Sequence, residues 1–167
     1  MKKRILVSVL AMFLLPAASG QDTSAASYKD KLLVRMLRAI TYAQYFKEGT
    51  AAKKPECKKS CAYIEAVMSA DDSQIEEIAV DVYGKYFPLN QLEEIVRFYE
   101  SPSGKAVLVF QRAHNTNKDS TLTLDSMQVA EFNAFCKSPA GTIVKEVLED
   151  QKIQKELLGK FIHAFAK

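Results

Sequence analysis

The amino-acid sequence predicts an all-α protein, a compact bundle of about six or seven helices. Its apolar residues recur at intervals of three and four, which is the spacing of one helix face. No stretch alternates strictly between apolar and polar residues, and no hairpin dipeptide separates two such stretches. No low-complexity linker divides the chain after residue 27, so we expect a single helical domain over residues 28–167.

The first twenty residues have the features of a cleavable export signal. Three basic residues are followed by an apolar stretch over residues 5–15 and by Pro16. Ala18 and Gly20 are small residues at the places that a signal peptidase reads, so we expect cleavage after Gly20 and a periplasmic location. The apolar stretch is shorter than the ~20 residues that cross a bilayer, and no later one is longer, so we expect no transmembrane segment in the mature chain.

Removal of this signal changes the charge of the protein. The whole chain has a net charge of +3, and Lys2, Lys3 and Arg4 carry three positive charges with no acidic residue among the first twenty. Taking three from +3 leaves a mature net charge of zero. A basic surface is what nucleic acid and anionic membranes attract, so we expect no nucleic-acid partner.

The elements after the signal are predicted in order. Residues 21–27 are polar and are expected to form a disordered lead-in, and an apolar stripe predicts a first helix over 28–46, followed by a loop over 49–55. A second helix is expected to turn Cys61, Ile64 and Met68 inward. Asp71 or Asp72 is expected to cap a third helix, which ends at Pro88. The inward residues of that third helix are expected to be Ile75, Ile78, Val82 and Tyr86.

Two similar sharp corners follow, 37 residues apart. Each has a Ser-Pro-x-Gly sequence, with Ser101, Pro102 and Gly104 in the first copy and Ser138, Pro139 and Gly141 in the second. Proline disfavours helical geometry in the residue before it, so we expect each helix to break at its serine. The serine hydroxyl can then cap the next helix, with proline at the tolerated first position and glycine allowing close packing.

The apolar residues before the two corners also match in phase. Leu92, Ile95 and Phe98 share one helix face in the first copy, and Val129, Phe132 and Phe135 share the equivalent face in the second. This match indicates an internal helix-corner-helix repeat. The other interpretation is that Ser-Pro-x-Gly is simply a common way to start a helix.

The first copy also carries a family resemblance. Residues 81–107 read DVYGKYFPLNQLEEIVRFYESPSGKAV, and the order of the aromatic pairs, Leu92, Ile95 and the corner resembles the bacterial exported family catalogued as domain of unknown function 2059. The resemblance covers about residues 78–138. It implies an all-helical exported protein, and it implies no activity, cofactor or catalytic residue.

Three cysteines remain after removal of the signal. Disulfides form in the compartments to which exported proteins go, so one bridge and one remaining thiol is the simplest count. We favour a local bridge between Cys57 and Cys61, and a long-range bridge between Cys61 and Cys136 is the alternative. A thiol-based redox role for Cys57 and Cys61 is weighed because Lys58 and Lys59 would lower a thiol pKa, but the pair lacks the Cys-x-x-Cys spacing of thioredoxin-like enzymes.

The remaining polar residues form no recognisable catalytic or metal-binding group. The acidic pairs are adjacent in sequence, which splays their side chains around a helix instead of aiming both at one atom. His114 and His163 are isolated from each other and from the cysteines. The sequence therefore predicts no enzyme, no metal site and no cofactor.

The last predicted helix, over 139–166, is amphipathic. Its apolar side broadens beyond Leu157, and Phe161 and Phe165 lie near its end. This helix is therefore a candidate for docking in a partner's groove or for contact with a membrane surface.

We interpret the sequence as a non-catalytic periplasmic module that interacts with another envelope protein or has a structural role in the envelope. The alternative from another class is a carrier of a small apolar ligand, bound between the two halves of the repeat and lined by Phe98, Tyr99, Phe132 and Phe135. A cavity between these rings would favour the carrier, and an exposed apolar patch would favour the interaction module.

Overall fold

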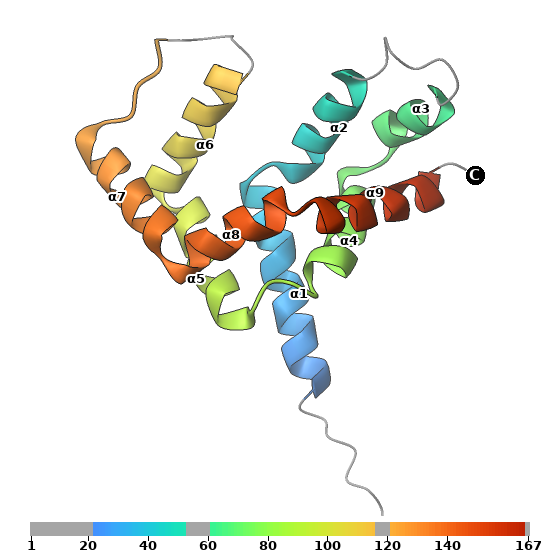
Figure 1. Ribbon diagram of the computed structural model, residues 1–167, viewed down its shortest axis with the longest axis horizontal. Helices are drawn as coiled ribbons and strands as arrows, with labels where there is room; N and C mark the ends of the chain where they lie inside the picture. Colours follow the sequence, from blue (N-terminus) through green and yellow to red (C-terminus); the bar gives the residue numbers. More distant parts are fainter. Residues whose placement is uncertain (1–21, 53–60, 116–120, 166–167) are drawn as a thin grey trace, which may run out of the picture.

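The computed structural model describes residues 22–52, 61–115 and 121–165, and every regular element in these ranges is a helix (Figure 1). The all-α prediction is therefore confirmed. The nine helices of the described ranges outnumber the predicted six or seven, chiefly because two of the predicted long helices are each broken into two. Residues 1–20, and with them the predicted signal and its cleavage site, lie outside the described ranges.

The helices follow one another with short connections. Their bounds are α1 Asp22–Ala39, α2 Tyr42–Ala52, α3 Cys61–Ser69, α4 Asp72–Tyr83, α5 Leu89–Glu100, α6 Pro102–Asn115, α7 Ser126–Lys137, α8 Pro139–Glu149 and α9 Gln151–Phe165. None of the described helices is both long and apolar enough to cross a membrane.

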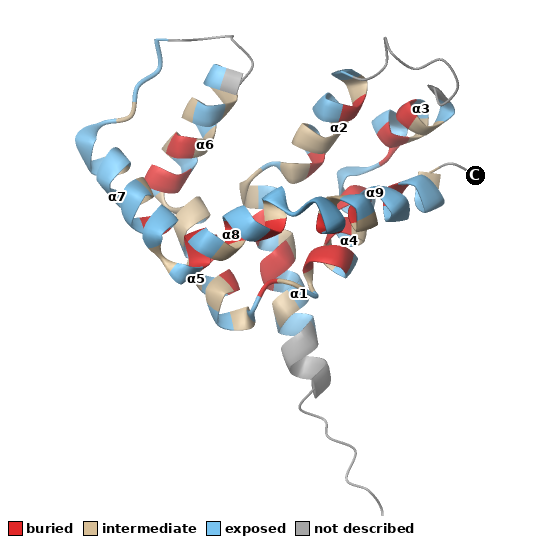
Figure 2. Ribbon diagram, viewed as in Figure 1, coloured by how far each residue is buried: buried red, intermediate tan, exposed pale blue. Residues whose placement is uncertain are grey.

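The core lies where α1, α4, α5, α8 and α9 meet, which Figure 2 shows as the main concentration of buried residues. Leu33 of α1, Ile75 of α4, Leu92 of α5 and Phe161 of α9 are completely buried there. Fully burying a side chain of this size contributes about 1.5 to 3 kcal/mol, so these residues hold the bundle together. Helix α5 is central because it packs against α1, α6 and α8.

The predicted first helix over 28–46 is wrong, because the chain turns between α1 and α2. Thr41 has a φ of 52°, a left-handed conformation that β-branched residues rarely adopt. The turn brings Tyr42 edge-on to Tyr83 at 5.8 Å and stacks Phe46 on Phe161 at 4.0 Å between ring centroids. Tertiary packing of these rings therefore stabilises a break that no glycine or proline announces.

The predicted last helix over 139–166 is also two helices. Helix α8 ends at Glu149, and the Asp150 carboxylate accepts hydrogen bonds from the backbone N–H groups of Lys152 (2.7 Å) and Ile153 (3.1 Å). Aspartate is a favoured residue at the start of a helix because it accepts such bonds, and here it starts α9.

Smaller corrections concern the ends of the N-terminal helices. Helix α1 begins at Asp22, inside the segment expected to be disordered, where Ala25 and Ala26 favour helix. Helix α2 runs through Gly49 to Ala52, into the expected loop. In both places the helix continues into polar residues that the apolar stripe does not mark.

The faces of α3 and α4 also differ in part from prediction. In α3 the inward residue is Val67, which is completely buried, whereas Met68 is 46% exposed. Helix α4 is capped by Asp71 as expected, but it ends at Tyr83 and not at Pro88. Pro88 instead precedes the first turn of α5, a place where its missing N–H costs nothing.

Helices α6 and α7 lie together at one side of the molecule, away from α3 and most of α9 (Figure 1). Arg112 near the end of α6 ties this side to α2, since its guanidinium donates to Glu48 at 2.7 Å and to Gln44 at 3.1 Å. Helix α7 packs mainly against α6 and α8. It is the least buried of the described helices, with Phe135 as its one buried residue (Figure 2).

Candidate functional site

The two Ser-Pro-x-Gly corners have the same backbone geometry. Ser101 has φ −69° and ψ 160°, and Ser138 has φ −75° and ψ 160°, so both serines are extended residues between two helices. The Gly104 N–H donates to Ser101 Oγ at 3.0 Å, and the Gly141 N–H donates to Ser138 Oγ at 3.2 Å. These corners start α6 and α8 and set the directions in which the two helices leave.

The glycines lie where no side chain fits. A Cβ on Gly104 would collide with the carbonyl oxygen of Phe98, and a Cβ on Gly141 would collide with that of Phe135. The close approach is therefore between the two helices that each corner joins. This tight turn lets the residues before the corner and the residues after it reach the same neighbours.

The four aromatic residues proposed to line a ligand pocket pack against one another instead. Phe98 stacks on Phe135 with ring centroids 4.0 Å apart and planes 4° apart, and Phe132 stacks on Phe98 at 6.2 Å. Tyr99 meets Phe135 edge-on at 5.6 Å, and burial raises the pKa of its hydroxyl to about 12. The rings occupy the space that the carrier hypothesis assigned to a ligand, and they join α5 to α7.

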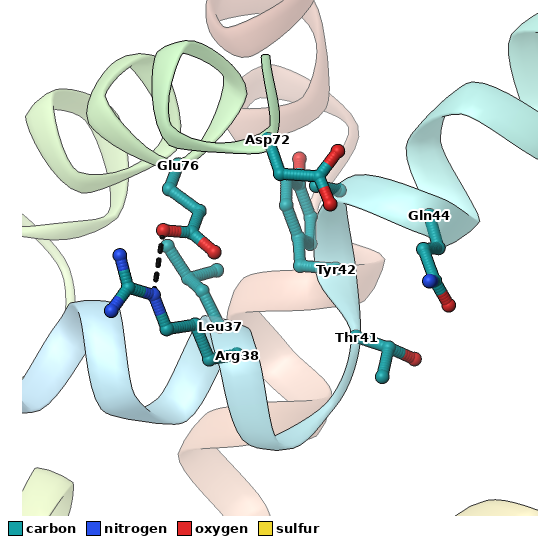
Figure 3. Close-up of a pocket in the computed structure, with 8 residues that line it drawn as sticks. Leu37, Arg38, Thr41, Tyr42, Gln44, Asp72 and Glu76 are labelled. Atoms are coloured by element: carbon teal, nitrogen blue, oxygen red, sulfur yellow. Dashed lines mark hydrogen bonds and ion pairs between the residues drawn. The ribbon is translucent and has the colours of Figure 1, made fainter.

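A polar cavity of about 140 Å³ lies beside the turn between α1 and α2 (Figure 3). Glu76 lines it and is 7% exposed, and Arg38 Nε donates to Glu76 Oε2 at 2.9 Å. Asp72, at the same cavity, accepts from Lys47 Nζ at 2.8 Å. Both carboxylates therefore have a basic partner, which favours a structural role for the two ion pairs in joining α4 to α1 and α2.

An open apolar groove of about 290 Å³ lies between α6 and the chain entering α7. Its lining residues are Lys105, Ala106, Val109, Phe110, Leu122, Thr123, Leu124 and Gln128. Val109 is 57% exposed and Leu122 is 38% exposed. We call this feature the α6–α7 groove, and it is the candidate functional site.

Exposed apolar side chains gather near the groove. Of the eight large hydrophobic residues that are exposed in the described ranges, four lie between residues 109 and 129, and they are Val109, Leu122, Met127 and Val129. The sequence analysis missed this site because it placed Val129 on a core face and did not examine residues 105–115 after the first corner. The available signal was the composition of 126–137, which carries only two charged residues.

The C-terminal residues proposed as a partner face are partly in the core. Phe161 is completely buried and stacks on Phe46, so it is not open to a partner, and this part of the prediction is corrected. Phe165 is half-buried and stacks on Phe161 at 6.2 Å. The exposed apolar residues of α9 are Leu158 and Ile162, on the other side of the helix.

The cysteine predictions are only partly within the described chain. Cys57 and the side chain of Cys61 lie outside the described residues, so the proposed local bridge is not described. Cys136 is an exposed residue with a free thiol, and partial burial of its sulfur raises its pKa. A raised pKa means less thiolate, which is the opposite of what a reactive cysteine needs.

No metal site is visible in the part of the chain that the structure describes, since no three His, Cys, Asp or Glu side chains are grouped to hold an ion. The two histidines, His114 and His163, lie on different helices, α6 and α9. The predicted absence of cofactors stays a prediction.

With the corner and the groove on the page, the comparison with known families can be read against them. Residues 73–113 match the family model described as an uncharacterized protein conserved in bacteria (DUF2059). The matched segment runs from the first turn of α4 into the last turn of α6. It contains the first corner and the α6 wall of the groove, and it ends before the second corner.

This match agrees with the resemblance seen in the sequence of residues 81–107. The DUF2059 segment is shorter at its C-terminal side than the expected 78–138, so the match does not extend to the second copy of the repeat. No curated protein and no solved structure matches the chain.

Proposed function

We propose that this protein is a non-catalytic, exported interaction module, and that the α6–α7 groove binds an apolar segment of another envelope protein. The observation that carries the proposal is the open groove itself, with Val109 and Leu122 exposed on its walls. Clustered apolar side chains on a protein surface mark interaction sites more often than scattered ones do.

The groove suits a short helix or an extended segment with a few apolar anchors. Apolar side chains on a partner would meet Ala106, Val109, Phe110, Leu122 and Leu124. Each large apolar anchor that becomes fully buried contributes about 1.5 to 3 kcal/mol, so two or three anchors support a specific contact. Lys105 at the edge favours a partner segment with an acidic residue beside its apolar ones.

The location follows from the same reasoning as before. The basic start, apolar stretch and small residues of 1–20 support export through a cleavable signal, with cleavage after Gly20. A mature protein of zero net charge has no general attraction to an anionic membrane, which supports a protein partner over a lipid surface.

The proposal is tested by photo-cross-linking in living cells. A photoactivatable amino acid at Val109 is expected to give a discrete covalent adduct with another envelope protein, identified by mass spectrometry. Leu158 provides the matched control, because it is similarly exposed (42%) but lies on α9, away from the groove. Adducts of equal yield at both positions, or none at Val109, would contradict the proposal.

A charge placed in the groove sharpens this test. Val109→Asp is expected to abolish the adduct formed from a photoactivatable residue at Leu122, because the buried contact would then hold an unpaired carboxylate. The substitution is at an exposed position, so the free energy of unfolding should change by no more than about 0.5 kcal/mol. Leu158→Asp should leave the adduct unchanged.

A small apolar ligand remains the alternative occupant. The groove volume of about 290 Å³ is close to the lower limit of about 300 Å³ for ligand pockets. Apolar molecules co-purifying with the exported protein, and displaced by Val109→Asp, would favour the carrier. The thiol-enzyme alternative would require Cys57 and Cys61, and it fails if neither reacts with an alkylating reagent in the folded protein.

A further inference from the structure

Helix α7 has an outward face that no other described part of the chain covers. Met127, Ala130 and Ala134 are all exposed, and Met127 is 63% exposed. They are spaced at three and four residues, so they lie on one stripe of the helix. The inward residues, Gln128, Phe132 and Phe135, are on a different side, since each residue of a helix is turned by about 100° from the one before.

The two charged residues of α7 border this outward face on opposite sides. Glu131 lies three residues before Ala134 and Lys137 lies three residues after it. Both side chains are exposed, and neither forms an ion pair with another described residue. At about 100° per residue, Glu131 falls about 60° to one side of Ala134 and Lys137 falls about 60° to the other.

This arrangement is complementary to itself when one copy is reversed. We propose that the outward face of α7 binds a second copy of this chain, with the two α7 helices antiparallel and a two-fold axis passing beside Ala134. The axis exchanges residues that are equally far from Ala134. Glu131 of each copy therefore meets Lys137 of the other, and the two Ala134 methyl groups face each other at the centre.

The small central residues make this pairing geometrically feasible. Ala130 and Ala134 have only a methyl group each, so the two helix axes can come as near as the close end of the 8 to 10 Å range of packed helices. At that separation the longer Glu131 and Lys137 side chains reach across the edges of the contact. The result is two reciprocal ion pairs that flank a narrow apolar centre.

The charges of the face argue for a second copy over other occupants. Its single positive and single negative charge cancel, so an anionic membrane is not attracted. A parallel pairing in the same register would place Glu131 beside Glu131 and Lys137 beside Lys137, which is repulsive. Only the antiparallel arrangement makes both contacts attractive.

This contact is separate from the proposed partner groove. The groove is formed on the side of α7 that carries Gln128, more than a quarter turn from Ala134. Failure of the groove to bind a partner would therefore leave the pairing intact, and the reverse is also true. A twelve-residue helix is about 18 Å long, so the interface is small and the association is expected at micromolar protein concentrations.

The test is sedimentation equilibrium of the mature protein over a range of concentrations, with charge-swap variants. The wild type is expected to form dimers, and either Glu131→Lys or Lys137→Glu should weaken dimer formation by about tenfold, because two attractive contacts become repulsive. The double variant Glu131→Lys with Lys137→Glu restores both ion pairs in reversed form. It should dimerise about as well as the wild type.

Controls separate this effect from general changes of charge or folding. Lys155→Glu reverses an exposed charge on α9 and should leave the association unchanged. All variants should have the circular dichroism spectrum and the denaturation midpoint of the wild type, because the changed residues are exposed. A wild type that stays monomeric at high micromolar concentration, single swaps without effect, or a double swap that does not recover would each overturn the proposal.

Discussion

The two corners of this protein are alike in backbone and unlike in surroundings. Ser101 and Ser138 have nearly the same dihedral angles, the same hydroxyl cap and the same glycine packed against a carbonyl. However, α5 before the first corner buries Leu92, Ile95 and Val96, while α7 before the second buries only Phe135. The same local sequence therefore closes a core helix in one place and a surface helix in the other.

The difference teaches that the corner and the core are specified separately. A Ser-Pro-x-Gly sequence fixes the turn through the proline, the serine cap and the glycine, all within a few residues. Burial depends on what lies opposite the helix. Helix α5 has α1 and α8 as neighbours, whereas α7 is covered by α6 and α8 on one side and is exposed on the other.

The largest expected difference is between the equivalent residues Leu92 and Val129. Leu92→Ala should lower the free energy of unfolding by about 2 to 5 kcal/mol, because it leaves a cavity in the core. Val129→Ala should change it by less than about 0.5 kcal/mol, because Val129 is 41% exposed. Denaturant unfolding measures both, and similar losses would mean that the two helices are equally buried in solution.

The next test replaces the corner glycines. Gly104→Ala and Gly141→Ala both place a Cβ against a backbone carbonyl, so each should cost about 1 to 3 kcal/mol. We expect the larger cost at Gly104, because α5 is held by its neighbours and α7 can shift more easily. Unchanged denaturation midpoints for both variants would show that the corners are looser than they are here.

The smallest effect is expected at the serine caps. Ser101→Ala and Ser138→Ala each remove a hydroxyl that accepts a hydrogen bond from the glycine N–H, at a cost of about 0.5 to 2 kcal/mol. Because the cap is local, the two losses should be equal within error. Ser101→Thr and Ser138→Thr keep the hydroxyl and serve as controls, and an alanine variant as stable as the wild type would show that its cap contributes nothing.

What the sequence could predict is what its local residues control. The helix starts at Pro102 and Pro139 and the caps at Ser101 and Ser138 follow from a proline, a hydroxyl and a glycine, and they are found where they were expected. The break at Thr41 could not be predicted, because aromatic packing between distant helices stabilises it. The break at Asp150 had a signal in the aspartate, but the unbroken apolar stripe concealed it.

The candidate site was predicted less well than the fold. An apolar residue at helical spacing has the same pattern whether it faces a core or solvent, so Val129 and Leu92 could not be told apart. Phe161 was assigned to a partner face and is in the core, while Val109 was not considered and is exposed. Deciding between these cases requires knowing which helices lie opposite each other.

Native-state amide hydrogen exchange of the mature protein tests the difference between the two helices most directly. We expect the central amides of α5 to exchange only through global unfolding, with the highest opening free energy in the chain. We expect the amides of α7 to exchange through local opening, at a clearly lower free energy. Protection of α7 equal to that of α5 would contradict the division into a core helix and a surface helix.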